Sequence, residues 1–262
     1  PDRTWGTAPE AAPYSYTTQP TVSIPYVTHD LYLFEGETTA DLHCTTPGAA
    51  IHYTLDGQEP TLQSPLYRQP IRLTEAVQIK AKAYKDGFAP SRTFAIRSTP
   101  AILRPALAVS ETEKAAMLPG VSYTYYEGYF RKVADLDGIQ PVGKGRMPEP
   151  TITQAPEADH FGYLFQGAIE IPEDGVYTFF TRSDDGSVLY ISGEEVVNND
   201  GSHAAISATG RIPLKKGFHP FTLKYFEDYE GEHLSWGWKK PQDTEFSPIP
   251  AACLVTLSPE EP

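Results

Sequence analysis

Two neighbouring carboxylates, Asp184 and Asp185, have the residue type and the spacing that metal chemistry requires. They follow a β-rich run and precede Gly186. Because successive side chains of a strand point to opposite faces, both carboxylates can reach one ion only with an unusual backbone, such as a cis peptide bond. An all-oxygen site would suit a hard cation such as calcium. The alternative is structural, with Asp185 and Gly186 in a tight turn and Asp184 accepting backbone N–H bonds.

The usual sequence signatures of catalysis are missing. The chain contains no GxSxG elbow, HExxH helix, Walker loop or GxGxxG turn. Acidic residues are numerous, but no two of them stand out as the carboxylate pair of a glycosidase. We therefore expect the chain as given not to be an enzyme.

The charge balance argues against nucleic acid as a partner. The 262 residues carry a formal net charge of −13, and such a surface repels a polyanion. The acidity is spread along the chain, so most of it favours solubility, and a few carboxylates remain candidates for holding calcium. No apolar run approaches the roughly 20 residues of a membrane-spanning helix. Cys44 and Cys253 are expected to be buried free thiols, with a disulfide as the alternative.

The elements that must position these side chains are β-strands. In residues 77–83 apolar and polar side chains alternate, which is the period of a half-buried strand. The 20 Gly and 25 Pro indicate short strands joined by tight turns. The predicted fold class is all-β, with an immunoglobulin-like β-sandwich followed by a second β-sandwich or barrel.

Composition shifts divide the chain. Helix formers are concentrated in residues 101–118, where Ser110 and Glu113 make a capping box possible. The predicted order is a linker (1–20), a first β-domain (21–100), a linker or short helix (101–118), a second β-domain (119–257) and a tail (258–262).

The most specific motif runs from Tyr177 to Gly193, where a strand, the sequence Ser-Asp-Asp-Gly-Ser and an apolar strand follow one another. This run resembles the signature of PA14 domains. Further stretches resemble the family in order: residues 123–130, 133–138, 196–203, 217–226 and 234–236. The resemblance spans about residues 120–255. It implies a β-sandwich or barrel of a kind found in secreted glycosidases, adhesins and toxins, with carbohydrate binding as its commonest role.

The PA14 resemblance also implies site residues. In adhesins that resemble this pattern, such an aspartate pair binds calcium, and the calcium binds sugar hydroxyls. Further ligands come from a later loop, here residues 227–233, although the asparagine of the lectins has no obvious counterpart. The implied metal ligands are Asp184, Asp185, Asp228 and Glu230, and the implied carbohydrate contacts are Asp184, Asp185, Tyr229 and His203.

Two tryptophans have two interpretations. In a strand, Trp236 and Trp238 would lie on the same face as Leu234, which favours core packing over a platform for sugar rings. Tyr229, in a predicted loop, is the better candidate for stacking on a sugar.

A second resemblance lies in residues 22–98. The turn Tyr53-Thr-Leu-Asp-Gly-Gln-Glu-Pro60 and the flanking strands resemble the C-terminal domain of chitobiases and β-hexosaminidases. Physically, Asp56-Gly57 supplies the turn and Pro60 stiffens its exit. The resemblance implies a small immunoglobulin-like sandwich attached to glycoside hydrolases. That family's catalytic Asp-Glu pair, in its His-x-Gly-x-Asp-Glu setting, is absent.

Together these features predict a non-catalytic accessory region of a secreted, periplasmic or cell-surface glycoside hydrolase, with a β-N-acetylhexosaminidase first in line. Because the chain begins at Pro1 rather than Met, we expect the export signal and the catalytic domain to lie upstream. The expected partners are a host or dietary oligosaccharide and that catalytic domain, and the candidate cofactor is calcium. Nucleic-acid binding and membrane insertion are not expected. The alternative is a structural spacer that packs against the catalytic domain.

Overall fold

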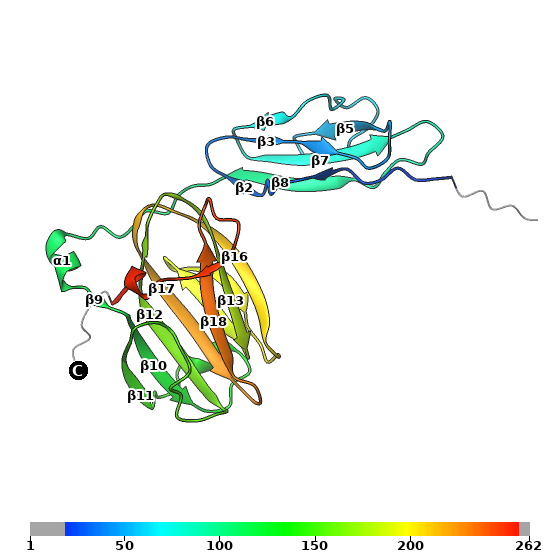
Figure 1. Cartoon of the computed structure of the whole chain (residues 1–262). Helices are drawn as coiled ribbons and strands as arrows, with labels where there is room; N and C mark the ends of the chain where they lie inside the picture. Colours follow the sequence, from blue (N-terminus) through cyan, green and yellow to red (C-terminus); the bar gives the residue numbers. More distant parts are fainter. Residues whose placement is uncertain (1–18, 257–262) are drawn as a thin grey trace, which may run out of the picture. The chain divides into compact units, whose positions relative to one another are not determined.

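The computed structural model describes residues 19–256, which form two compact units that divide after Pro100 (Figure 1). Most of the linker predicted for residues 1–20, and the tail predicted for 258–262, lie outside the described residues. Nearly all regular structure is β, so the all-β prediction is confirmed. Among the described residues, no helix has the length and apolar character needed to cross a membrane.

The described residues of the first unit form eight short strands. They are β1 (Tyr26–Val27), β2 (Leu33–Phe34), β3 (Thr38–Ala40), β4 (Leu42–His43), β5 (Ala50–Thr54), β6 (Ile71–Leu73), β7 (Val77–Tyr84) and β8 (Phe94–Pro100). One sheet has the order β2-β8-β7-β5, and the pairs β3-β6 and β1-β4 complete the unit.

Strand β7 shows the predicted alternation. Ile79, Ala81 and Ala83 are buried, while the intervening residues are partly exposed. The predicted turn after β5 is also present, because Gly57 has φ +81° and the N–H of Gln58 donates to Asp56 Oδ1 at 3.0 Å. An aspartate side chain that accepts a hydrogen bond from the backbone N–H two residues later commonly stabilises such turns.

The second unit begins with a segment that packs on its own domain. The N–H of Arg104 donates to Pro213 O at 2.9 Å, and that of Leu107 donates to Phe218 O at 2.8 Å. Helix α1 (Glu111–Ala116) follows, with the predicted capping box between Ser110 and Glu113. These hydrogen bonds order the segment that precedes the strands of the second unit.

Two antiparallel sheets make up the rest of the second unit. One has the order β11-β10-β12-β17-β14-β15, with β20 pairing with β12 and β9, and the other has the order β16-β13-β18-β19. The elements are β9 (Leu118–Pro119), β10 (Val121–Glu127), η1 (Val133–Leu136), β11 (Gly143–Met147), β12 (Phe161–Ile171), β13 (Gly175–Asp184), β14 (Ser187–Ile191), β15 (Glu194–Asn199), β16 (Ile206–Leu214), β17 (Gly217–Glu227), β18 (His233–Lys239), β19 (Ser247–Pro248), η2 (Ala251–Cys253) and β20 (Leu254–Thr256).

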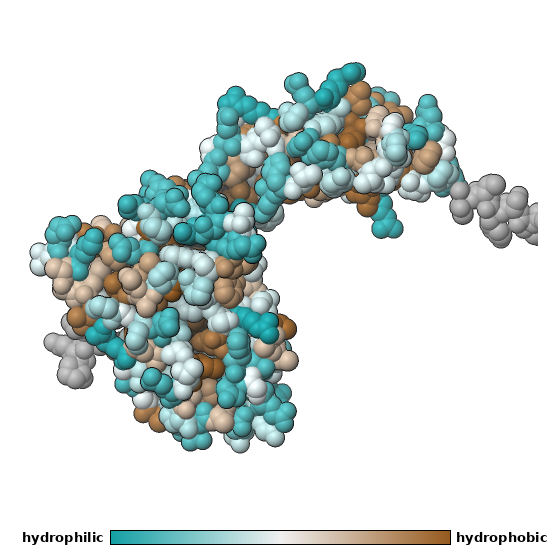
Figure 2. Space-filling view, viewed as in Figure 1, coloured by the Kyte–Doolittle hydropathy of each residue, from teal (hydrophilic) through white to brown (hydrophobic). Residues whose placement is uncertain are grey.

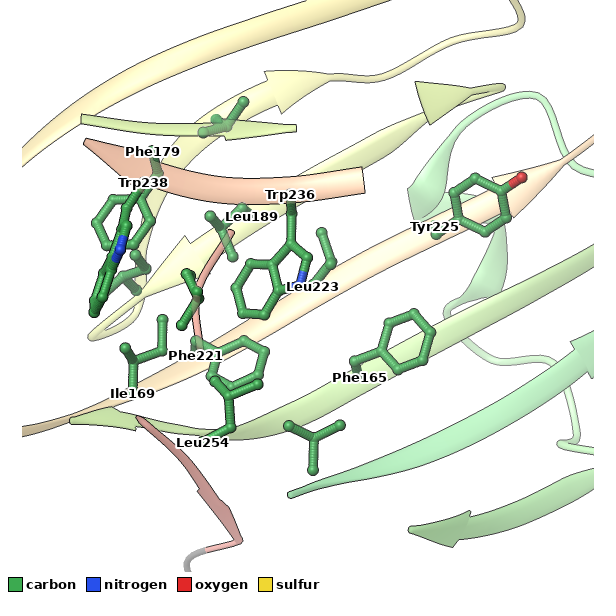
Figure 3. Close-up of a cluster of buried hydrophobic side chains, with 14 of the residues drawn as sticks. Phe165, Ile169, Phe179, Leu189, Phe221, Leu223, Tyr225, Trp236, Trp238 and Leu254 are labelled. Carbon is green, nitrogen blue, oxygen red and sulfur yellow. The ribbon is translucent and has the colours of Figure 1, made fainter. Parts of the chain in front are cut away.

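Aromatic side chains fill the space between the two sheets of this sandwich. Figure 3 shows Trp236 and Trp238 of β18 pointing toward residues of the facing sheet, and the rings of Trp236 and Phe221 lie 5.1 Å apart. Both tryptophans are buried, at 8% and 3% exposure. The interpretation of these tryptophans as core residues is therefore confirmed.

Outside these cores the surface is mixed. On the face shown in Figure 2, hydrophilic and hydrophobic side chains are interspersed over both units. Cys44 and Cys253 are free thiols, but each is partly exposed rather than buried as expected.

Candidate metal centre

Five loops of the second unit meet at one end of the sandwich. Strand register shows this directly, because Glu127 pairs with Phe161 and Phe161 pairs with Glu227. In the other sheet Asp184 pairs with His233. The loops after β10, before β12, between β13 and β14, between β15 and β16, and between β17 and β18 therefore lie close together.

Asp184 and Asp185 stand where the chain leaves one sheet for the other. Strand β13 ends at Asp184 in the four-stranded sheet, and β14 begins at Ser187 in the eight-stranded sheet. The peptide bond between the two aspartates is cis. The crossing is tight, since a Cβ on Gly186 would lie 2.4 Å from the Phe226 ring.

Both aspartates accept backbone hydrogen bonds from neighbouring loops. The Asp185 carboxylate accepts from the N–H groups of His203 and Asp228, each at 2.7 Å. Asp184 Oδ2 accepts from the N–H of Ala205 at 3.0 Å. The structural role considered for Asp184 and Asp185 is therefore present, and the pair connects the loops that follow β15 and β17.

A third carboxylate, Glu227, completes the group. Asp184, Asp185 and Glu227 each offer an oxygen atom, and these atoms all lie within 4.8 Å of one another. Glu227 is fully buried, and its Oε2 lies 3.0 Å from the Tyr225 hydroxyl, which also lies 2.6 Å from the carbonyl oxygen of Asp184. The other oxygen, Oε1, is buried with no hydrogen-bond partner among the described residues.

The electrostatics of this group favour a cation. The pKa of Glu227 is raised to about 7, chiefly by burial and also by the negative charges of Asp185 and Asp184, while the hydrogen bond from the Tyr225 hydroxyl lowers it. Like charges this close repel one another, and an unpaired buried carboxylate is costly. The donor atoms are all hard oxygens, so these residues fit calcium better than a metal that prefers nitrogen or sulfur.

The other predicted ligands lie nearby but outside this group. Asp228 Oδ2 accepts from the Ser202 hydroxyl at 3.2 Å, and Glu230 is exposed. The structure brings Glu227, rather than Asp228 or Glu230, close to both aspartates. The physical reason is that successive side chains of an extended chain point in opposite directions. Glu227 faces the two aspartates, whereas the carboxylate of the next residue, Asp228, lies near Ser202 and His160.

The predicted carbohydrate contacts have different surroundings. Tyr229 is 65% exposed at the edge of the site. The ring nitrogens of His203 lie 3.1 and 3.0 Å from the carbonyl oxygens of Ala204 and Asn199. His203 therefore meets the carboxylates through its backbone N–H, and its ring contacts its own loop.

A sequence signal for Glu227 existed. Phe221, Leu223, Tyr225 and Glu227 share one parity, and the first three are buried core residues. An acidic residue at a core-facing position of a strand is unusual unless it is paired or binds a metal. The parity rule that placed Trp236 in the core would have placed Glu227 inside as well.

Two families match this chain. The chitobiase/beta-hexosaminidase C-terminal domain matches residues 33–95, and the PA14 domain matches residues 118–251. A Beta-hexosaminidase of Porphyromonas gingivalis (strain ATCC BAA-308 / W83) is 26% identical over 202 residues, which cover 71% of this chain and 23% of that protein. The chain thus spans about a quarter of the length of this curated relative.

Two solved structures are similar to part of this chain. The PA14 domain of the MpAFP antifreeze protein has a TM-score of 0.44 and 14% identity, with 59% of this chain and 96% of that chain covered. The Epithelial Adhesin 9 A domain from Candida glabrata, in complex with Galβ1-3GlcNAc, has a TM-score of 0.45 and 13% identity, with 59% and 95% covered.

Proposed function

Because the chain belongs to the PA14 domain family, we propose that its second unit binds carbohydrate at a calcium site formed by Asp184, Asp185 and Glu227. The observation that carries the proposal is the buried Glu227 Oε1, which has no partner among the described residues and belongs to a group of three carboxylates. A bound calcium ion supplies the positive charge that this group lacks and a coordination site for hydroxyl oxygens.

The residues of the chain would hold the site in place. Next to the aspartates in the sequence, Ser183 and Ser187 join Asn199 in a buried hydrogen-bonded network. Ser183 Oγ lies 2.8 Å from Ser187 Oγ and 2.9 Å from Asn199 Nδ2. A fully satisfied buried network of this kind fixes the geometry of the groups above it. The exposed Tyr229 beside the site offers a ring for the apolar face of a sugar.

We further propose that the chain is an accessory part of a longer secreted, periplasmic or cell-surface glycoside hydrolase. A β-N-acetylhexosaminidase is the first choice, because the curated relative is named a Beta-hexosaminidase and the first unit matches the domain named for that class. In this proposal catalysis belongs to another domain of the longer protein, and the second unit keeps a host or dietary glycan close to it.

A structural role is the second candidate, and one observation favours it. Three of the four carboxylate oxygens of Asp184 and Asp185 accept backbone N–H bonds from neighbouring loops. Such a group would order the loops without any sugar, and the unit would then be a spacer that braces the catalytic domain.

Glycan binding with and without a chelator separates these two functions. We expect the full chain to retain oligosaccharides on an immobilised glycan panel in calcium buffer and to lose them in EDTA. Restoring calcium should restore binding. Absence of binding across a broad panel in calcium would support the spacer, and binding that is insensitive to EDTA would remove calcium from the site.

A further inference from the structure

Three aromatic side chains form a strip at the same end of the second unit. The rings of Tyr129 and His160 lie 4.2 Å apart, and those of His160 and Tyr229 lie 6.2 Å apart in a stacked arrangement. Tyr129 is 81% exposed and Tyr229 is 65% exposed. Exposed tyrosine rings that flank a shared histidine ring form an apolar patch, and such patches can mark sites of interaction.

The strip is anchored from below and across its loops. Phe130 is fully buried, and its ring packs against the ring of Phe226. The N–H of Gly128 donates to the carbonyl oxygen of His160 at 2.8 Å, which joins the loop after β10 to the loop before β12. These contacts hold the exposed Tyr129 in position, so a ligand would meet a surface that is already organised.

A second connection joins the strip to the metal group. The N–H of Glu230 donates to Asp159 Oδ1 at 3.1 Å, which joins the loop of His160 to the loop of Tyr229. The N–H of Asp228 donates to Asp185 Oδ2 at 2.7 Å, and Asp228 Oδ1 lies 3.9 Å from His160 Nδ1. Asp228 therefore contacts both the carboxylate group and the aromatic strip, which makes the two parts of one surface.

The polar groups around the strip are mostly acidic. The acidic residues are Glu149, Glu157 and Asp159 in the loop before β12, Glu227 at the end of β17, and Asp228, Glu230 and Glu232 in the loop after it. Two basic residues, Arg131 and Lys132, follow Tyr129. Carboxylates accept hydrogen bonds from hydroxyl groups and repel sulfate and carboxylate groups, so the surface favours an uncharged polyhydroxy ligand over an anionic one.

We propose that Tyr129, His160 and Tyr229 form an extended subsite for a neutral oligosaccharide, beside the metal group. This rests on the proposed carbohydrate-binding function and extends it to a ligand class. The C–H groups on the flat face of a pyranose ring carry partial positive charge and meet the negative face of an aromatic ring. A metal ion can hold one sugar unit, and the three neighbouring rings offer further faces on which sugar units can stack. The ligand is therefore at least a disaccharide.

The test compares binding of defined glycans by Tyr129 variants of the full chain. The probes are neutral oligosaccharides that contain N-acetylhexosamine, of one to four residues, and their sialylated and sulfated counterparts. The wild-type chain should prefer neutral glycans of two or more residues. Y129A should weaken that binding by about twofold to tenfold, whereas Y129F, which keeps the ring, should bind nearly as well as the wild type.

Calcium titration of the same proteins keeps the two proposals separate. Y129A should bind calcium as the wild type does, and Y32A, which removes an exposed tyrosine of the first unit, should leave both affinities unchanged. Wild-type binding that Y129A does not weaken overturns the strip and leaves the proposed function intact. A preference for sialylated or sulfated glycans overturns the ligand class. If the wild type binds no glycan, the proposed function fails, and the strip fails with it.

Discussion

Glu227 is the residue on which the proposed calcium site depends. The two aspartates also have a structural role, since their oxygen atoms accept N–H bonds. Glu227 has no comparable explanation, because one of its oxygens is buried without a partner among the described residues. A group that is buried, acidic and incompletely satisfied is either costly to the fold or completed by a ligand.

Removal of the Glu227 charge should change how stability depends on pH when metal is absent. Burial raises the pKa of this carboxyl to about 7 from its ordinary value of 4.5. Between these pH values the folded state binds the proton more tightly than the unfolded state does, so the free energy of unfolding falls as pH rises through the interval. The loss is on the order of 3 kcal/mol by the relation between pKa and free energy.

Urea denaturation in EDTA at pH 5 and pH 8 measures this effect. The Glu227→Gln variant should lose much less stability between the two pH values than the wild type. Glu230→Gln, in which an exposed carboxylate of the same loop is removed, should behave as the wild type does. Equal pH dependence in the wild type and Glu227→Gln would show that the pKa of the Glu227 carboxyl is not raised in the folded protein.

At the scale of elements, sequence patterns anticipated much of the fold and only part of the site. Alternation identified β7, and parity placed Trp236 and Trp238 in the core. The aspartate pair was visible because its two members are adjacent. The aromatic strip was not, because Tyr129, His160 and Tyr229 come from three loops that only the strand order of the sheet brings together.

Gly210 allows strands β15 and β16 to pack closely together. A Cβ added to Gly210 would lie 1.5 Å from the carbonyl oxygen of Val196. Gly210→Ala should therefore displace β15 or β16 and lower the free energy of unfolding by about 1–3 kcal/mol or more. Gly143→Ala is the control, since its nearest neighbour is a Tyr125 atom at 3.9 Å, and a change within about 0.5 kcal/mol is expected. Thermal denaturation of both variants measures the difference, and equal midpoints would contradict the packing described for β16.

At the scale of the whole molecule, the chain is two units with separate cores. Calcium should therefore stabilise the second unit alone. At a free calcium concentration 100 times the dissociation constant, the gain is about 2.7 kcal/mol by mass action. The fluorescence of Trp236 and Trp238 reports the second unit if Trp5 is first replaced by Phe.

Thermal unfolding of that Trp5→Phe chain, followed by fluorescence and by calorimetry, tests the independence of the units. The fluorescence transition should rise in calcium, while a second calorimetric transition, that of the first unit, should stay in place. A single transition that shifts as a whole would mean that the two units unfold together.

Calcium titration by calorimetry is the most direct test of the central claim, that Asp184, Asp185 and Glu227 form one calcium site. The wild type should bind one calcium ion per chain. Glu227→Gln should weaken binding at least about tenfold because it removes a charged ligand, and Glu230→Gln should leave the affinity unchanged. No calcium binding by the wild type, or a loss in Glu230→Gln that Glu227→Gln does not show, would contradict this account.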